Sequence, residues 1–314
     1  MQIIILYLIM GIIIGMLFPI QASISARLGS YSKTPLTASF IAFSLGSVIL
    51  LIINLIVNPA GISVGIDFSY PLYVFIGGAI AGIGFHVANV ILFLKLGASV
   101  TTIITVTGQM IVGVLIDHFE WFGVSANPIS TTRIIGTIIM ILAISLVQSK
   151  KQRDLTESSE EKKDSKIIWV ILGVFAGFLP PLQTAINGEL RVATGSLLGA
   201  TFISFFVGAI ILLIMILITR RRLEIPLYDT QNNRIPVWVY MAGIFGIFIV
   251  TGNIVLLPVL GSVLTTMVFL LGQMIMAVII DQFGIFNLQK RKIDNRRIAA
   301  LVLTIIGIIF VKFL

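Results

Sequence analysis

Amide, hydroxyl and carboxylate side chains recur at regular intervals within two apolar segments of this chain. The segment 97–117 carries Thr101, Gln109 and Asp117, and the segment 259–281 carries Thr265, Gln273 and Asp281. Intervals of four or eight residues keep side chains on one slowly drifting stripe of a helix. Polar groups rarely face lipid, so both stripes should face other helices. They predict either a cavity wall that binds a solute or hydrogen bonds between helices.

A second group of polar residues lies beside prolines near the ends of two other apolar segments. The group consists of Gln21, Ser25, Gln183 and Asn187. Pro19 and Pro181 precede these residues, and proline frees a carbonyl and bends a helix. The pattern predicts either a bent, substrate-binding helix or a helix that simply ends at the membrane interface. In the first of these segments, Gly11 and Gly15 have the GxxxG spacing that is typical of close helix packing.

A third pair of segments carries asparagines at matching positions, Asn89 and Asn253. His86 lies one turn before Asn89 and has no counterpart in the second half. Because histidine titrates near neutral pH, His86 could bind a proton or a substrate. The alternative is a buried structural histidine.

Two aspartate–arginine pairs have the same spacing in the two halves. Asp117 and Arg133 are 16 residues apart, as are Asp281 and Arg297. Each aspartate ends one apolar segment and each arginine begins the next, so each pair can meet at the mouth of a hairpin. The pairs are predicted to tie helix ends together, either as static ion pairs or as gates. If the ion pair is what matters, exchanging Asp281 and Arg297 should restore transport that is lost in either single variant.

The segments that carry these residues have the composition of membrane helices. The chain has 314 residues, of which 58% are hydrophobic and 11% charged, whereas soluble domains have about 25% charged residues. Stretches this long and apolar suit helices rather than barrel strands. The predicted segments are 3–26, 36–57, 72–94, 97–117, 130–148, 167–188, 197–219, 236–257, 259–281 and 297–313.

The composition also argues against several classes of function. The chain has no cysteine and two histidines, which leaves no thiol nucleophile and makes a zinc site unexpected. The motif GISVG at 61–65 matches GxSxG but lacks the strand–turn–helix context of a nucleophile elbow. We therefore expect no enzyme, no cofactor and no metal. The net charge of +8 fits cytoplasmic loops of a membrane protein better than a nucleic-acid partner.

The two halves of the chain repeat each other. Between Gly82 and Phe122, 17 of 41 positions are identical to those 164 residues later. Each half has five apolar segments, and because five is odd, the second half must enter the membrane in the opposite orientation. We predict an all-α integral membrane protein with ten transmembrane helices in two inverted five-helix repeats. The repeats are 1–148 and 167–314, joined by a polar linker at 149–166.

The distribution of Lys and Arg predicts the orientation. With loops assigned alternately to the two sides, 18 of the 21 Lys and Arg residues fall on one side. By the positive-inside rule that side is cytoplasmic. The linker 149–166 is therefore predicted to be cytoplasmic and both termini to lie outside. Position 27 carries Arg27, whereas its repeat partner is Glu189.

Four stretches of sequence resemble a known family. FPIQASISARL and PPLQTAINGEL, followed by GQMIVGVLIDHF and GQMIMAVIIDQF, are similar to the YdcZ-type family of the drug/metabolite transporter superfamily. The resemblance covers the whole chain and indicates a fused pair of five-span units. It implies transport of a small metabolite or drug across a bacterial plasma membrane. Small multidrug relatives carry a glutamate within the first span, and this chain has none there, so their proton-coupled export of cationic drugs is not implied.

We therefore expect a secondary transporter, an exporter, that works by alternating access. Its partners would be a small-molecule substrate, preferably neutral, zwitterionic or amphipathic, and membrane lipids. The working unit would be a monomer of two repeats or a homodimer. The alternatives are a flippase for lipid intermediates and a non-transporting membrane scaffold. A dry, fully packed centre between the repeats would favour the scaffold.

Overall fold

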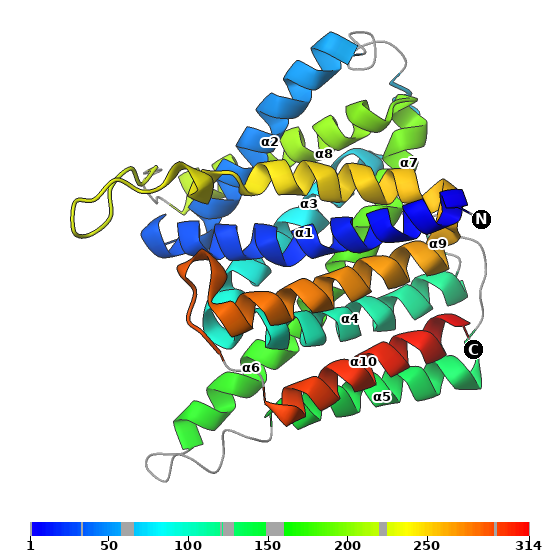
Figure 1. Cartoon of the computed structure of the whole chain (residues 1–314). Helices are drawn as coiled ribbons and strands as arrows, with labels where there is room; N and C mark the ends of the chain where they lie inside the picture. Colours follow the sequence, from blue (N-terminus) through cyan, green and yellow to red (C-terminus); the bar gives the residue numbers. More distant parts are fainter. Residues whose placement is uncertain are drawn as a thin grey trace.

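A computed structural model describes residues 2–32, 34–57, 66–119, 121, 129–148, 160–219, 225–291 and 294–313. These residues are almost entirely helical (Figure 1). The α-helices are α1 (Gln2–Ser32), α2 (Pro35–Val57), α3 (Leu72–Leu96), α4 (Ala98–Phe119), α5 (Thr131–Gln148), α6 (Glu160–Gly177), α7 (Leu179–Thr194), α8 (Leu197–Ile218), α9 (Ala242–Phe283) and α10 (Asn295–Phe313). Two 3₁₀ turns, η4 (Val237–Tyr240) and η5 (Ile285–Asn287), flank α9.

Several helices have the length and apolarity needed to cross a membrane. Within the described ranges there are six such stretches, and three shorter apolar helices accompany them. The six stretches are Ile4–Ser32, Pro35–Val57, Leu72–Leu96, Ala98–Ile116, Ile167–Thr194 and Leu197–Ile218. Large hydrophobic side chains such as Ile56 and Ile218 are exposed on their outer faces, as expected where lipid replaces water.

Each predicted apolar segment lies in helix over most of its length, but two boundaries differ from the prediction. The segment 167–188 is divided at Phe178, and α7 begins with Pro180 and Pro181 in its first turn. Proline has no N–H to donate to the preceding turn, so a helix readily breaks before it. The segments 236–257 and 259–281 instead run together in the 42-residue helix α9.

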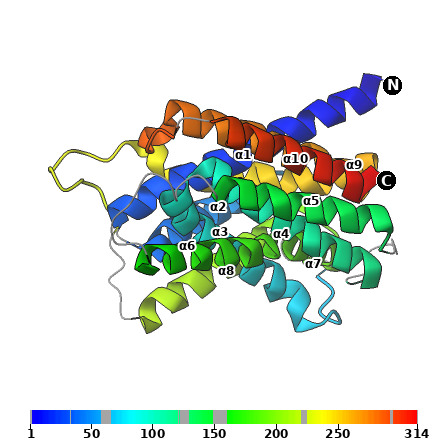
Figure 2. The same cartoon turned by 90° about the horizontal axis from the view of Figure 1, so that it is seen from below.

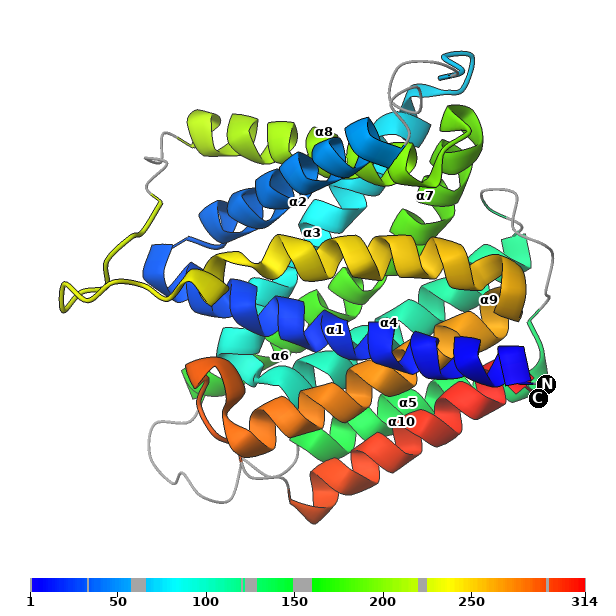
Figure 3. The ribbon, with the colours of Figure 1, turned by 45° about the horizontal axis from the view of Figure 1, so that its top comes forward.

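The helix α9 doubles back, and α1 lies between its two limbs (Figure 3). A Cβ atom at Gly252 would touch Ile14, and one at Gly15 would lie less than 3.0 Å from the carbonyl oxygen of Phe269. In a straight helix, the positions of Gly252 and Phe269 would be about 26 Å apart. Since both contact neighbouring residues of α1, the two limbs of α9 must fold onto the same helix. The close approach at Gly15 is the packing that the GxxxG spacing predicts.

The helices pack in pairs that each take one member from either half of the chain. These pairs are α1 with α9, α2 with α8, α3 with α7, α4 with α6, and α5 with α10. The two termini lie at the same end of the molecule (Figures 1 and 2). From that end α1 runs away, whereas α6 and α7 run toward it (Figure 1). The halves are therefore interleaved in one body, and their first segments run in opposite directions.

Candidate substrate cavity

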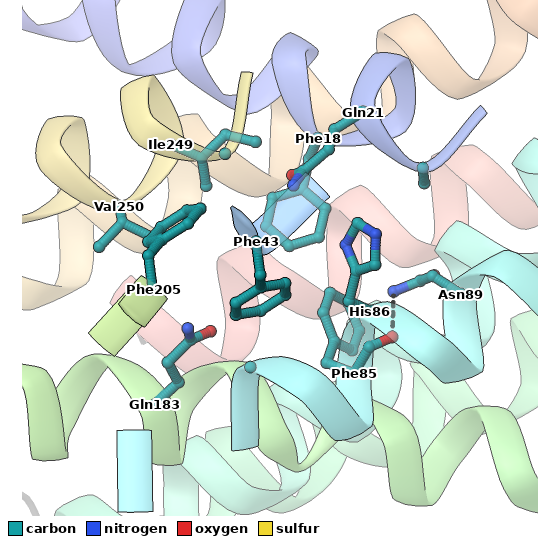
Figure 4. A pocket seen from close by; sticks show the side chains of 13 residues that line it. Phe18, Gln21, Phe43, Phe85, His86, Asn89, Gln183, Phe205, Ile249 and Val250 are labelled. Carbon is teal, nitrogen blue, oxygen red and sulfur yellow. Dashed lines mark hydrogen bonds between the residues drawn. The ribbon is translucent and has the colours of Figure 1, made fainter. Parts of the chain in front are cut away.

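A cavity lies where α1, α2, α3, α7, α8 and α9 meet (Figure 4). Four phenylalanine rings, Phe18, Phe43, Phe85 and Phe205, form much of its wall. The polar groups that line it are Gln21, His86, Asn89 and Gln183. Its volume is about 50 Å³, which is enough for a few water molecules. A solute of metabolite size therefore requires the surrounding side chains to move apart.

The cavity is lined by matching positions of the two halves. The matched pairs are Gln21 with Gln183, Phe43 with Phe205, and Gly82 with Gly246. Figure 4 shows Gln21 and Gln183 on opposite sides of the Phe43 ring. The lining is unequal at two matched positions, where α3 has Phe85 and His86 and α9 has Ile249 and Val250. The cavity therefore lies between the two halves, and each half contributes matching positions to its wall.

Glycines allow each half to insert its side chains into the other. A Cβ at Gly82 would lie within 3.0 Å of the amide of Gln183, and a Cβ at Gly246 would lie 2.7 Å from Nε2 of Gln21.

The two phenylalanines at matched positions fit in the same reciprocal way. Phe205 packs against Gly46, and Phe43 packs against Gly208. Their rings lie 5.2 Å apart. Reciprocal contacts of this kind hold the walls of the cavity together from both halves.

The polar groups of the cavity are only partly satisfied by the protein. Nδ2 of Asn89 donates to the carbonyl oxygen of Phe85 at 3.1 Å. The ring of His86 lies edge-on to Phe43, with centroids 5.8 Å apart. Nε2 of His86 is buried and has no hydrogen-bond partner among the described residues. Buried polar atoms are normally paired with protein or water, so this nitrogen is available to water or a bound solute.

Other predicted substrate ligands lie away from the cavity. Gln109 and Gln273 are 6% and 3% exposed, and α4 and α9 pack together in the same region through apolar residues that include Met110 and Met274. The predicted ligands Thr101 and Thr265 are also buried. None of these four residues is among those that line the cavity.

The remaining predicted ligands lie on helices that border the cavity but do not line it. Ser25 and Asn187 are buried on α1 and α7, and Oδ1 of Asn187 has no hydrogen-bond partner among the described residues. Asn187 packs against Gly78. Asn253 is partly buried on α9. Of the predicted set, the structure gathers Gln21, His86, Asn89 and Gln183.

The four phenylalanines are cavity residues that the sequence analysis did not identify. In an apolar chain with 21 phenylalanines, the sequence does not distinguish a phenylalanine that lines a cavity from one in the core. The repeat offered one usable signal, because Phe43 and Phe205 occupy matching positions. Phe18 directly precedes Pro19, the residue at which the sequence predicts a bent, substrate-binding helix.

The carboxylate of Asp281 binds the first turn of α4. Oδ1 accepts a hydrogen bond from the backbone N–H of Ala98 and Oδ2 accepts one from Ser99, both at 2.9 Å. An acidic side chain at the start of a helix binds its free N–H groups and the positive end of its dipole. The predicted partner Arg297 lies farther away, with Nη1 3.7 Å from Oδ2. Asp281 is therefore chiefly a cap that ties α9 to α4.

The matching pair in the first half is only partly described. Arg133 is buried near the start of α5. The side chain of Asp117 lies outside the described residues, so the Asp117–Arg133 pair stays a prediction. Among the described residues, no group of three His, Asp or Glu side chains could hold a metal ion.

The sequence of the chain matches a family model, and its fold matches solved structures. A family model described as "Putative inner membrane exporter, YdcZ" matches the chain twice, at residues 6–146 and 168–310. No curated protein matches. Six chains of solved structures match. One crystal structure, whose name states no activity, aligns over 96% of this chain and 95% of its own, with a TM-score of 0.59 and 12% identity. At that identity the likeness concerns the fold alone.

Proposed function

This chain belongs to the YdcZ family, and we propose that it exports a small metabolite or drug-like solute without net charge by alternating access. The observation that carries the proposal is the cavity lined by Gln21 and Gln183 from matching positions of the two repeats. Transporters built from inverted repeats bind substrate between the repeats near the middle of the membrane. A static scaffold would need no polar groups there.

The proposed architecture is ten membrane spans in two inverted five-helix repeats. The opposite directions of α1 and of α6 with α7 (Figure 1) support it, as does the position of both termini at one end. We propose that the linker 149–166 is cytoplasmic and that both termini lie outside, because 18 of 21 Lys and Arg residues fall on the linker side. Rocking of one repeat against the other would open the cavity to either side in turn.

The cavity lining supports an uncharged or zwitterionic solute with a flat apolar face. None of the residues that line it carries a fixed charge, and a bare ion at this depth would lack a counter-charge. The phenylalanine rings can stack on a planar solute. The two glutamine amides offer both donors and acceptors.

Replacing Gln21 or Gln183 with leucine tests the proposal. Each change keeps the size of the side chain and leaves the polar group of a bound solute without its partner, which weakens binding by about 1–3 kcal/mol. We expect the transport rate to fall about fivefold to 100-fold, since every 1.4 kcal/mol is a factor of ten. The measurement is movement of a metabolite panel, detected by mass spectrometry, in proteoliposomes that contain the purified protein.

Gln231→Leu is the matched control, because Gln231 is exposed in the loop before α9. It should transport like the unmodified protein. Equal rates for Gln21→Leu, Gln183→Leu and the control would contradict a role for the cavity. If no solute moved while a fluorescent lipid analogue crossed the bilayer, a flippase would replace the proposed exporter.

A further inference from the structure

A second, larger cavity of about 210 Å³ lies at one end of the helix bundle. It is bordered by the end of α1, the junction of α3 with α4, and the chain that follows α9. It shares no lining residue with the substrate cavity. We propose that this second cavity binds an oxyanion of the size of a phosphate group through Arg27 and Arg291.

The guanidinium of Arg27 is held in place but incompletely paired. It lies over the ring of Tyr31, with Cζ 4.6 Å from the centroid. Its Nε is buried and has no hydrogen-bond partner among the described residues. The backbone hydrogen bond from Asn233 is the largest cause of the lowered pKa of Asp229, and the charge of Arg27 is a smaller one. The unpaired Nε leaves Arg27 a donor for a ligand.

Arg291 lies on the opposite wall of the second cavity. Its Nη1 donates to the carbonyl oxygen of Leu96 at 2.8 Å, which fixes the side chain beside Gly97. Gly97 has a φ of 86°, and a Cβ there would lie 2.6 Å from Cδ of Arg291. Partial burial lowers the pKa of Arg291 below its ordinary value. A bound anion would offset that loss of hydration.

The acid that lines the second cavity does not neutralise both arginines. This acid is Asp281, whose oxygens accept the N–H groups of Ala98 and Ser99. Arginine forks bind phosphate and carboxylate oxygens through paired hydrogen bonds. Asn287 and Gln289 add amide donors to the lining. Donors in excess of acceptors, in a space of this size, favour an oxyanion.

The second cavity breaks the symmetry of the repeats. The repeat partner of Arg27 is Glu189, which accepts a hydrogen bond from the hydroxyl of Tyr73 at 2.8 Å. An anion site of this kind therefore belongs to one end of the bundle, the end that the proposed orientation makes cytoplasmic. Its phosphate could come from a soluble compound or from an anionic lipid headgroup, since both occur at that surface.

The test measures binding of inorganic phosphate and of lipid to the full chain in nanodiscs. In phosphatidylcholine nanodiscs, equilibrium dialysis with labelled phosphate should give saturable binding. Arg27→Gln should raise the Kd for phosphate at least tenfold. Arg27→Lys keeps the positive charge but loses the paired N–H donors of the guanidinium, and it should raise the Kd less. Arg296→Gln, an exposed arginine in the first turn of α10, makes the same charge change outside the cavity and should bind phosphate normally.

A second arm distinguishes the source of the phosphate. Native mass spectrometry after exposure to phosphatidylglycerol should detect retained lipid, lost in Arg27→Gln, if the site takes a headgroup. Saturable phosphate binding without retained lipid would assign a soluble ligand. A wild-type chain that binds neither phosphate nor lipid would overturn the proposal, as would equal weakening by Arg27→Gln and Arg296→Gln. Thermal melting of each variant establishes that it is folded.

Discussion

Gly15→Ala is expected to force α1 away from α9 and to lower the free energy of unfolding by about 1–3 kcal/mol, the usual effect of overpacking. The added Cβ would lie less than 3.0 Å from three backbone atoms of Phe269, its O, C and Cα. Backbone atoms cannot rotate out of the way as the end of a side chain can. The two helices must therefore separate, and the contacts between them weaken along their length.

The same substitution elsewhere provides the control. Gly113 in α4 and Gly188 in α7 have no atom within 4 Å of an added Cβ. Alanine is the better helix former by about 1 kcal/mol, so Gly113→Ala and Gly188→Ala should match or exceed the wild-type melting temperature. Gly272→Ala meets the backbone of Ile12 and should resemble Gly15→Ala. Melting followed by size-exclusion chromatography in detergent measures all four. If Gly15→Ala and Gly113→Ala had the same melting temperature, the close contact between Gly15 and Phe269 would be contradicted.

The helical class and the duplicated halves could be predicted because both leave a strong mark on the sequence. Apolar stretches of about 20 residues allow few structures other than membrane helices. Asn, Gln, Asp and Arg in register between two halves do not arise from apolar composition. Gln21 and Gln183 were predicted from their places beside Pro19 and Pro181, and both line the cavity.

Periodicity was less informative about Gln109 and Gln273. A stripe of polar residues predicts that one helix face points into the bundle, but it does not say which neighbour that face meets. In the structure, α4 and the second limb of α9 pack together in that region, whereas the cavity is lined by the first limb of α9 and by helices other than α4. Helix boundaries were predicted unevenly. The division at Phe178 was not predicted, although Pro180 and Pro181 mark it in the sequence. The doubling back of α9 agrees with the two separate segments, 236–257 and 259–281, that were predicted there.

Only one of the partners of Asp281 could be predicted from the sequence. The spacing of 16 residues predicts that Asp281 and Arg297 come near each other, and they do, at 3.7 Å. The nearer partners are backbone N–H groups about 180 residues earlier in the chain. Every residue except proline has such a group, so no residue type marks it in the sequence. The difference between the two kinds of partner changes what a charge exchange should do.

Asp281→Asn is expected to destabilise the junction of α3 and α4 and to reduce transport strongly. One carboxylate oxygen is replaced by an NH₂ group, which faces a backbone N–H and cannot accept from it. Arg297 and Arg291 also lose their nearby negative charge. Removing one member of a buried charged cluster destabilises by about 3–5 kcal/mol. Thermal melting and proteoliposome transport measure the two effects on the same preparation.

The double variant Asp281→Arg with Arg297→Asp separates the two roles of the carboxylate. It keeps an ion pair but places a guanidinium, which has no acceptor, against the N–H groups of Ala98 and Ser99. We therefore expect the exchange not to restore stability or transport, in contrast to what the spacing alone predicts. Asp229→Asn, the same chemical change in an exposed loop where water can replace the lost bonds, should be near neutral. Full recovery in the exchanged variant would instead identify the ion pair as the interaction that matters.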